Sequence, residues 1–262
     1  MFFTKMSAYG NDYLYVDCFA ERVLQPGSEA RKLCDRHDGV GADGLVLLCP
    51  SESADFRMRI FDPDGTEAEM CGNALRSASY LFRRTHGREA PVLSVETLAG
   101  VKQVFFPAGC DGKGIRTEFG KPEVGFVKKK LTAAGETVEA TSLSFGNPHL
   151  VVFGSEPTDE RFRKLGPALE HHALFPERTN VEFVSIVGED RFVLRTWERG
   201  CGETLCCATG SAASLAAARL QGKLGKRAIA VQKGGELPVE AGEDGTYSVT
   251  GDTRIVFTGN TF

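Results

Sequence analysis

The feature that most constrains this chain is an internal repeat in which residues 136 positions apart match. Four separate features share this spacing without an insertion: a Gly-Asn pair, a segment with a central arginine, a cysteine and a valine. They are Gly10-Asn11 with Gly146-Asn147, FRMRIFD (Phe56 to Asp62) with FVLRTWE (Phe192 to Glu198), Cys71 with Cys207, and Val95 with Val231. Four matches at one spacing indicate two halves that fold alike. Such halves are expected to present equivalent residues on opposite sides of an interdomain cleft, where small-molecule sites tend to occur.

Each half is predicted to contain a strand, a turn and a helix in that order. FRMRIF and FVLRTW alternate in the manner of half-buried strands. The run GNALRSASYLFRR after Cys71 predicts a helix with one apolar face, and ATGSAASLAAARL after Cys207 predicts a tightly enclosed one, because it is rich in alanine. The apolar face of the first helix would consist of Leu75, Ala78, Leu81 and Phe82. We therefore expect an α/β protein of two domains, which a chain of 262 residues can accommodate.

The composition excludes several classes of protein. A hydrophobic content of 42% and a charged content of 25% are those of a globular protein, not of a disordered or fibrous one. The net charge of -4 gives no field that would attract nucleic acid, and the basic run Lys128 to Lys130 is expected to be a solvated turn. The N-terminal segment has no signal-peptide pattern, and no apolar run approaches the roughly 20 residues of a membrane span. We expect a cytoplasmic protein with no membrane partner.

The eight cysteines divide into two catalytic candidates and six others. No CxxC pair is present and the five histidines have no zinc-ligand spacing, so no metal site is predicted. Two of the six lack a cysteine partner in the repeat: Cys206, which aligns with Met70 and is assigned to packing, and Cys201. The remaining four, also assigned to packing, are Cys18, Cys34, Cys49 and Cys110.

Cys71 and Cys207 each precede a predicted helix, and this position favours reactivity. Unpaired N–H groups at a helix N-terminus stabilise a thiolate and also bind carboxylates. Two such helix ends could hold one α-carboxylate while a thiolate faces one side of the α-carbon and a thiol faces the other. One cysteine would remove the α-proton and the other would protonate the opposite face. This chemistry is that of an amino-acid racemase that requires no pyridoxal or other cofactor.

A glycine-rich segment, GVGADG (Gly39 to Gly44), matches the dinucleotide-binding pattern but in the wrong context. That pattern needs a strand before it and a helix after it. Here LCDRHD resembles a helix end and LVLLCP resembles a buried strand, which is the reverse order. We therefore expect turns or a close approach to a ligand at these glycines, without nucleotide binding.

The sequence resembles the diaminopimelate epimerase family from its first residues to its last. Six blocks occur in the family's order: KMSAYGNDYLYVD, LCDRHDGVGADGLVLL, FDPDGTEAEMCGNALR, FGNPHLVVF, FPERTNVEF and WERGCGETLCCATGSA. The resemblance implies that Cys71 and Cys207 are the acid–base pair. It also implies two α/β domains, each with a mixed sheet wrapped around a central helix. We place the first domain at residues 1–115, with 252–262 returning to it, and the second at 116–251.

The resemblance also implies a set of substrate-binding residues. The backbone amides of Gly72, Asn73, Ala208 and Thr209 would hold the reacting carboxylate. The second amino-acid end of the substrate would be held by Asn11, Asn147, Asn180, Glu198 and Arg199. Arg199 offers a forked donor to a distal carboxylate, and Glu198 offers an acceptor to a distal ammonium group.

The chain departs from the family pattern at several positions. Ser7-Ala8 replaces His-Gly, while Ala74 and Ala208 replace glycines; Ala208 keeps the backbone N–H that the site needs. Asp62 stands where the family usually has an asparagine whose amide donates to the distal carboxylate, and an ionised aspartate would repel that group. An acid at this position suits a side chain that ends in a cation or a hydrogen-bond donor.

Three functions follow from these observations. The leading one is epimerisation of LL- to meso-diaminopimelate, in the synthesis of lysine and peptidoglycan precursors. The second is racemisation of histidine or another basic amino acid, which Asp62 would favour. The third is a non-catalytic or redox-sensing relative, in which two reactive thiols form a disulfide. The expected partner is an amino-acid substrate, and a homodimer is left open.

Overall fold

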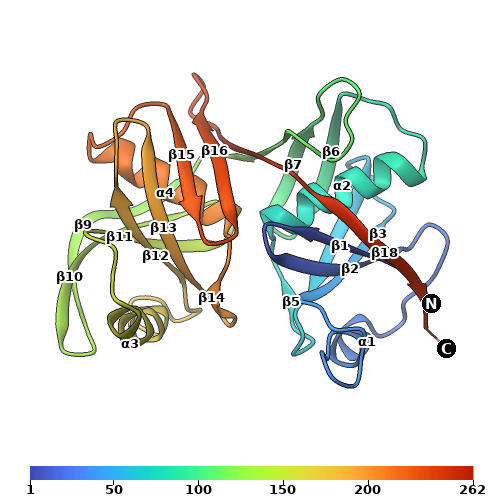
Figure 1. Ribbon diagram of the computed structural model, residues 1–262, viewed down its shortest axis with the longest axis horizontal. Coiled ribbons are helices and arrows are strands. Elements are labelled where there is room, and N and C mark those ends of the chain that lie inside the picture. The colour runs from blue at the N-terminus through green and yellow to red at the C-terminus, as the bar shows by residue number, and fades with distance from the viewer. Residues whose placement is uncertain (262) are drawn as a thin grey trace. The chain divides into compact units, whose positions relative to one another are not determined.

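The structure, a computed structural model, describes residues 1–261, which form two compact units (Figure 1). Unit 1 consists of Met1–Thr117 together with the chain from Thr250 onward, and unit 2 consists of Glu118–Val249. The α/β fold class predicted from the sequence is confirmed, since mixed sheet strands surround few helices. None of the helices among residues 1–261 is long and apolar enough to cross a membrane.

Unit 1 contains a mixed sheet and two helices. In chain order its elements are β1 (Phe2–Ala8), β2 (Asn11–Asp17), α1 (Pro26–Leu33), β3 (Gly44–Cys49), β4 (Phe56–Phe61), β5 (Glu67–Ala68), α2 (Gly72–Thr85), β6 (Val92–Thr97), β7 (Gly100–Phe105) and β18 (Arg254–Asn260), while β8 (Ile115–Gly120) crosses the boundary to unit 2. Strand β1 pairs antiparallel with β2 and β18, and β2 pairs parallel with β3. Strand β4 pairs antiparallel with β3 and β5 and parallel with β6, which pairs antiparallel with β7.

Unit 2 repeats this pattern. Its elements are β9 (Glu123–Ala133), β10 (Glu136–Ser144), β11 (Pro148–Phe153), α3 (Asp159–Glu170), β12 (Asn180–Ile186), β13 (Arg191–Glu198), β14 (Gly202–Thr204), α4 (Ala208–Leu220), β15 (Arg227–Gln232), β16 (Gly235–Ala241) and β17 (Tyr247–Gly251), whose end passes into unit 1. The pairings from β10 to β16 have the same parallel and antiparallel senses as those from β1 to β7. The repeat in the sequence is therefore a repeat in topology, with α2 equivalent to α4.

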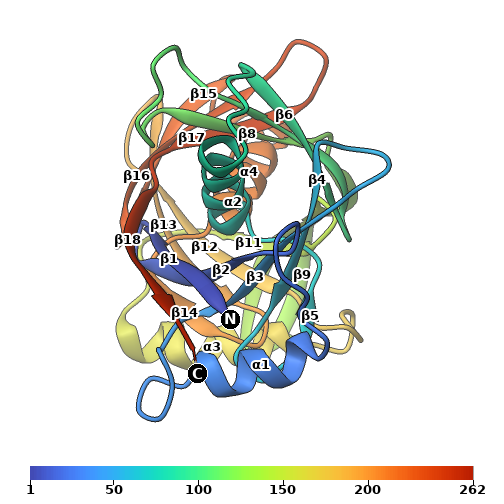
Figure 2. The same cartoon turned by 90° about the vertical axis from the view of Figure 1, so that its right-hand side faces the viewer.

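Helix α2 is enclosed on all sides rather than on one face. Every residue from Gly72 to Phe82 is buried, and the helix contacts β1, β2, β3, β4 and β6. Figure 2 looks along the axis of α2. The four residues of the predicted apolar face, Leu75, Ala78, Leu81 and Phe82, all lie in the core of unit 1, and the polar residues of the helix are buried as well. Helix α4 is enclosed in the same way, from Ala208 to Ala218, as its alanine content predicted.

The basic run Lys128 to Lys130 also differs from its prediction. It lies within strand β9, exposed to solvent, and is not a turn between elements. Lys128 has a φ of 54°, and its N–H donates to the Thr141 hydroxyl at 3.2 Å. The pairing register of β10 against β9 shifts at this point, between Ala140 and Ser142. The extra residue forms a β-bulge, and the strand remains paired on both sides of it.

The glycine-rich segment lies between a helix and a strand, as predicted. Helix α1 ends at Leu33 and β3 begins at Gly44. The N–H groups of Val40 and Gly41 donate to the carbonyl of Leu33 at 2.9 and 3.0 Å, which closes the helix end. This loop carries the chain from the surface of unit 1 to the beginning of β3, next to the beginning of β2.

An arginine–glutamate pair lies at equivalent positions in the two units. Arg59 donates to both carboxylate oxygens of Glu67 at 2.8 Å in unit 1. In unit 2, Arg195 donates to Glu203 at 3.2 and 2.8 Å. These pairs join β4 to β5 and β13 to β14, the short strands that lead into the two helices, so the repeat extends to side-chain contacts.

Candidate active site

Cys71 occupies the N-cap of α2, where its backbone is extended, with φ -132° and ψ 122°. Its carbonyl accepts the first helical hydrogen bond from the Leu75 N–H at 2.8 Å. The thiol is half-buried. The amides of Gly72 and Asn73 lie in the first turn, where N–H groups have no partner within the helix. The predicted thiol and the predicted carboxylate-binding amides are therefore adjacent in unit 1.

Asn11 and Asn73 are joined directly in unit 1. The Asn73 amide donates to the Asn11 side-chain oxygen at 2.8 Å, and the Asn73 oxygen accepts from Arg76 at 2.9 Å. The Asn11 amide reaches Asp43 at 3.4 Å, and Arg36 donates to Asp43 at 2.7 Å. Asp43 belongs to the glycine-rich segment, so that segment supports a predicted substrate residue.

Asp62 lies directly after β4, where the chain turns. Its N–H donates to the carbonyl of Thr66 at 2.9 Å, and its own carbonyl accepts from Gly65 at 2.8 Å. The residue is half-buried. Its equivalent in unit 2, Glu198, is the last residue of β13 and is also half-buried. Each unit therefore places one acidic residue at the end of an equivalent strand, β4 in unit 1 and β13 in unit 2.

Cys207 occupies the N-cap of α4, with φ -115° and ψ 112°, and is 5% exposed. Its sulfur accepts from the Gly210 N–H at 3.3 Å and lies 3.5 Å from the Thr209 hydroxyl. Its own N–H donates to Gln232 on β15 at 2.8 Å. Gln232 was not predicted from the sequence, because it is brought to α4 only by strand pairing.

Two ionisable groups of unit 2, Glu198 and Cys207, have pKa values raised far above their usual values. Burial, followed by the negative charges of Glu198 and Glu182, raises the pKa of the Cys207 thiol well above its usual value. Burial also raises the pKa of Glu198 to about 7, with Glu182 as a further cause, while the hydrogen bond from Thr204 at 2.5 Å opposes the shift. Burial and the neighbouring carboxylates therefore both favour the neutral thiol form of Cys207.

A buried polar chain in unit 2 was missed by sequence analysis. The Asn147 amide donates to the Thr209 hydroxyl at 3.3 Å, and the Asn147 oxygen lies 3.2 Å from His149. His149 in turn lies 2.7 Å from Glu182, and both side chains are fully buried. The repeat offered a signal, since His149 stands two residues after the repeated asparagine, as Tyr13 does in unit 1.

Asn180 and Arg199 complete the predicted residues of unit 2. The Asn180 amide donates to the carbonyl of Pro148 at 2.9 Å, and its oxygen accepts from the Arg199 N–H at 2.9 Å. Asn180 thus ties the start of β11 to the end of β13. The Arg199 guanidinium is half-buried and reaches the Glu177 carbonyl at 3.5 Å.

The other cysteines lie in varied surroundings. Cys34 and Cys206 are buried and Cys201 is exposed. The other three, which are half-buried, are Cys18, Cys49 and Cys110. Within residues 1–261 no group of three or more His, Cys, Asp or Glu side chains is arranged to hold a metal ion.

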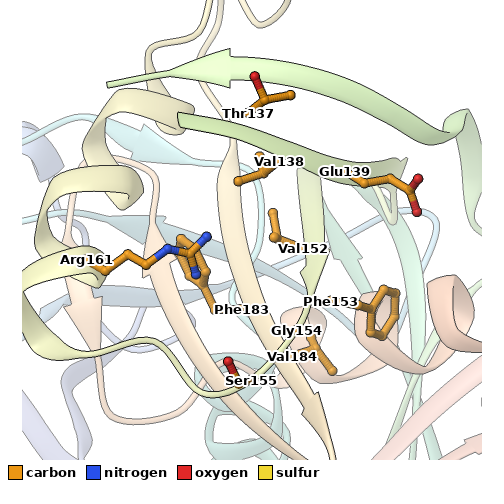
Figure 3. A pocket seen from close by; sticks show the side chains of 10 residues that line it. All are labelled: Thr137, Val138, Glu139, Val152, Phe153, Gly154, Ser155, Arg161, Phe183 and Val184. Carbon is orange, nitrogen blue, oxygen red and sulfur yellow. The ribbon is translucent and has the colours of Figure 1, made fainter. Parts of the chain in front are cut away.

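A hollow on unit 2 is separate from these residues (Figure 3). It has a volume of about 460 Å³ and lies among β10, β11, β12 and α3. Arg161 extends along it from α3, and its guanidinium is paired with Glu136 at 3.0 Å. None of the residues predicted to bind substrate lines this hollow, so its shape does not bear on the chemistry of Cys207.

Comparison with known sequences gives a consistent result. A family model described as "Diaminopimelate epimerase" matches residues 3–122 and 141–256. The diaminopimelate epimerase of Desulfovibrio desulfuricans is 42% identical over 282 residues, which cover 98% of this chain and 96% of that protein. The enzyme of the same name from Acetivibrio thermocellus is 42% identical, covering 99% and 98%. That from Methanococcus maripaludis is 38% identical and covers 99% of each.

Solved structures share the fold at low sequence identity. A probable proline racemase from Agrobacterium radiobacter, solved with bound carbonate, has a TM-score of 0.79 at 16% identity, covering 100% of this chain and 92% of that chain. A hydroxyproline epimerase from Agrobacterium vitis, with bound trans-4-hydroxy-L-proline, has a TM-score of 0.79 at 15% identity, covering 99% and 91%. On the sequence matches, which span nearly the whole chain, this protein belongs to the diaminopimelate epimerase family.

Proposed function

We propose that this protein inverts the α-carbon of an amino acid by two-base proton transfer, converting LL- to meso-diaminopimelate. The observation that carries the proposal is the equivalence of Cys71 and Cys207, each at the N-terminus of an enclosed helix. The family membership of the whole chain supports the same substrate.

In the proposed reaction one cysteine, as a thiolate, removes the α-proton and becomes a thiol. The other cysteine, as a thiol, protonates the opposite face and becomes a thiolate. The charge that develops on the substrate carboxylate is stabilised by the first-turn amides of α2 and α4, from Gly72, Asn73, Ala208 and Thr209. These steps move only protons between the thiols and the α-carbon, so the proposed reaction uses no cofactor.

The distal end of the substrate is assigned to residues outside the helix starts. Glu198 would accept from the distal ammonium group, and Arg199 would donate to the distal carboxylate. Asn11, Asn147 and Asn180 would supply amide contacts. Asn11 and Asn147 would also lie close to the reacting end, because their hydrogen bonds with Asn73 and Thr209 link them to the two helix starts.

A second substrate class is favoured by Asp62. Its equivalence to Glu198 gives each unit an acid at the end of an equivalent strand, β4 or β13. A second carboxylate attracts a cationic side chain and repels a distal carboxylate. Histidine or another basic amino acid is therefore the alternative substrate. We also propose a cytoplasmic location, in keeping with the family to which the chain belongs.

A substrate panel distinguishes these possibilities. LL-diaminopimelate, L-histidine and L-lysine are incubated separately with the protein, and optical rotation is followed with time. The proposal predicts change with LL-diaminopimelate. Change only with histidine or lysine would overturn the substrate and favour the alternative. No change with any of them, together with a reversible Cys71–Cys207 disulfide on oxidation, would identify the redox-sensing relative instead.

The raised pKa of Glu198 predicts how substrate binding depends on pH. Because the pKa of Glu198 is raised to about 7, its carboxylate becomes available to a cationic ligand only as the pH rises through that value. We expect kcat/KM to rise over the same range. Glu198→Gln should lower kcat/KM about 100-fold at pH 8 and remove the inflection near 7. The exposed Glu177→Gln serves as the control, and an inflection that persists in Glu198→Gln would contradict the assignment.

A further inference from the structure

Tyr13 is a hydrogen-bond donor to the Cys71 sulfur. It lies on β2, which packs against α2, and its hydroxyl donates to the sulfur at 3.4 Å. The side chain is 8% exposed, so little water competes for the contact. Tyr13 is not among the residues predicted from the sequence, because 58 residues separate it from Cys71.

The position of the Tyr13 ring depends on Gly44. The two residues are opposite each other in the parallel pairing of β2 with β3. A Cβ atom at position 44 would lie 3.0 Å from Cε1 of Tyr13 and 2.7 Å from the carbonyl oxygen of Phe61. Tyr15 packs edge-on against the ring, with 6.4 Å between centroids. The last glycine of the glycine-rich segment therefore leaves the space in which Tyr13 reaches Cys71.

The two catalytic sulfurs have different donors. The repeat equates Tyr13 with His149, but His149 bonds to Asn147 and Glu182 and not to the sulfur. The Cys207 sulfur instead accepts from the Gly210 N–H. Among the described residues, the Cys71 sulfur accepts from a phenolic hydroxyl, whereas the Cys207 sulfur accepts from a backbone N–H and lies 3.5 Å from the Thr209 hydroxyl.

We propose that the Tyr13 hydroxyl is a catalytic hydrogen-bond donor that stabilises the thiolate form of Cys71. A hydrogen bond to an ionised acceptor is stronger than one to a neutral acceptor, so the contact favours the thiolate over the thiol. The contact itself is independent of the substrate. Its role in turnover rests on the proposed function, in which the Cys71 thiolate is the base for one direction of the reaction.

Three other ionisable residues, on β2 and α2, make contacts that do not involve the Tyr13 hydroxyl. Tyr15 on β2 donates to the Ala74 carbonyl at 3.4 Å, and burial raises the pKa of its phenol above the usual range. Arg76 on α2 bonds to Asn73. Asp12, also on β2, is paired with Lys5 and Arg36.

The test measures alkylation of Cys71 by iodoacetamide in the full-length protein. Modified peptides are quantified by mass spectrometry over a pH series for the wild type, Tyr13→Phe and Tyr15→Phe. The exposed Cys201 of the same molecule is the internal reference. Each variant loses one oxygen and keeps its ring, so packing against Gly44 is retained. Thermal unfolding of all three proteins checks this.

Tyr13→Phe is expected to slow Cys71 alkylation about tenfold near pH 7 and to move its pH midpoint up by about one unit. Cys201 in every protein and Cys71 in Tyr15→Phe should change less than about twofold, within the spread of surface effects. In the epimerase assay kcat should fall about tenfold, as the thiolate fraction does, with KM retained.

An unchanged Cys71 alkylation profile in Tyr13→Phe, or an equal change in Tyr15→Phe, would overturn the inference. The alkylation measurement tests the hydrogen bond from Tyr13, whereas the epimerase assay tests the proposed function. A wild type that epimerises no amino acid but shows the Tyr13 effect would leave the hydrogen-bond role standing and reject only the proposed function.

Discussion

Replacement of either Cys71 or Cys207 by alanine is expected to lower kcat for epimerisation at least about 1000-fold, because each thiol supplies one of the two proton transfers. The two losses should not multiply in the double variant, since removal of one transfer already stops inversion. The measurement is the initial rate of optical change with LL-diaminopimelate, at a substrate concentration well above KM.

Cys201→Ala is the matched control, because Cys201 is exposed and lies only six residues before Cys207. It should keep wild-type kcat within about twofold. Circular dichroism of each variant excludes loss of folding as the cause. Either alanine variant with a kcat near that of Cys201→Ala would remove its cysteine from the mechanism.

Phe162→Ala is expected to lower the free energy of unfolding by about 3–5 kcal/mol. Phe162 is fully buried in the core between α3 and the sheet of unit 2. Its ring lies 5.3 Å from that of Phe183 and 5.8 Å from that of Trp197, and the Arg195 guanidinium lies 4.0 Å from its centroid. The truncation removes all these contacts and leaves a cavity beside the Arg195–Glu203 pair.

Urea unfolding followed by tryptophan fluorescence measures this change. Trp197 is the only tryptophan of the chain, so the signal comes from unit 2. Leu174→Ala is the control in the same unit, because Leu174 is 43% exposed and its truncation should cost less than about 1 kcal/mol. A Phe162→Ala midpoint equal to that of the Leu174 variant would show that this core does not stabilise unit 2.

The helix starts could be predicted from the sequence because their signals are local. Cys71 and Cys207 each precede a run of small and apolar residues, and the helices begin at the next residue in both units. The context of the glycine-rich segment was also correct, for the same reason. The enclosure of α2 was not predictable from its own residues. The buried Arg76, for example, donates to Asn73 on its own helix and to the carbonyl of the distant Asp252, and its guanidinium lies over the Tyr9 ring.

The contacts that tune the two sulfurs could not be predicted from local patterns. Tyr13 reaches Cys71 across 58 residues, and Gln232 reaches Cys207 across 25. Both contacts depend on the register in which strands pair around the helices. The repeat identified the cysteines as equivalent but gave no indication that their donors differ. The error at Lys128 has a similar origin, since the pairing of β9 with β10 is not visible in the local sequence.

The central claim is that two thiols exchange the α-proton of the substrate with one supplied by solvent. The most direct measurement is proton NMR of LL-diaminopimelate incubated with the wild-type protein in deuterated water. The account predicts meso-diaminopimelate that carries deuterium at the inverted α-carbon, while LL-diaminopimelate recovered early in the reaction retains its proton. Formation of the meso product with the original proton retained, or exchange that Cys71→Ala and Cys207→Ala leave at the wild-type rate, would contradict the account.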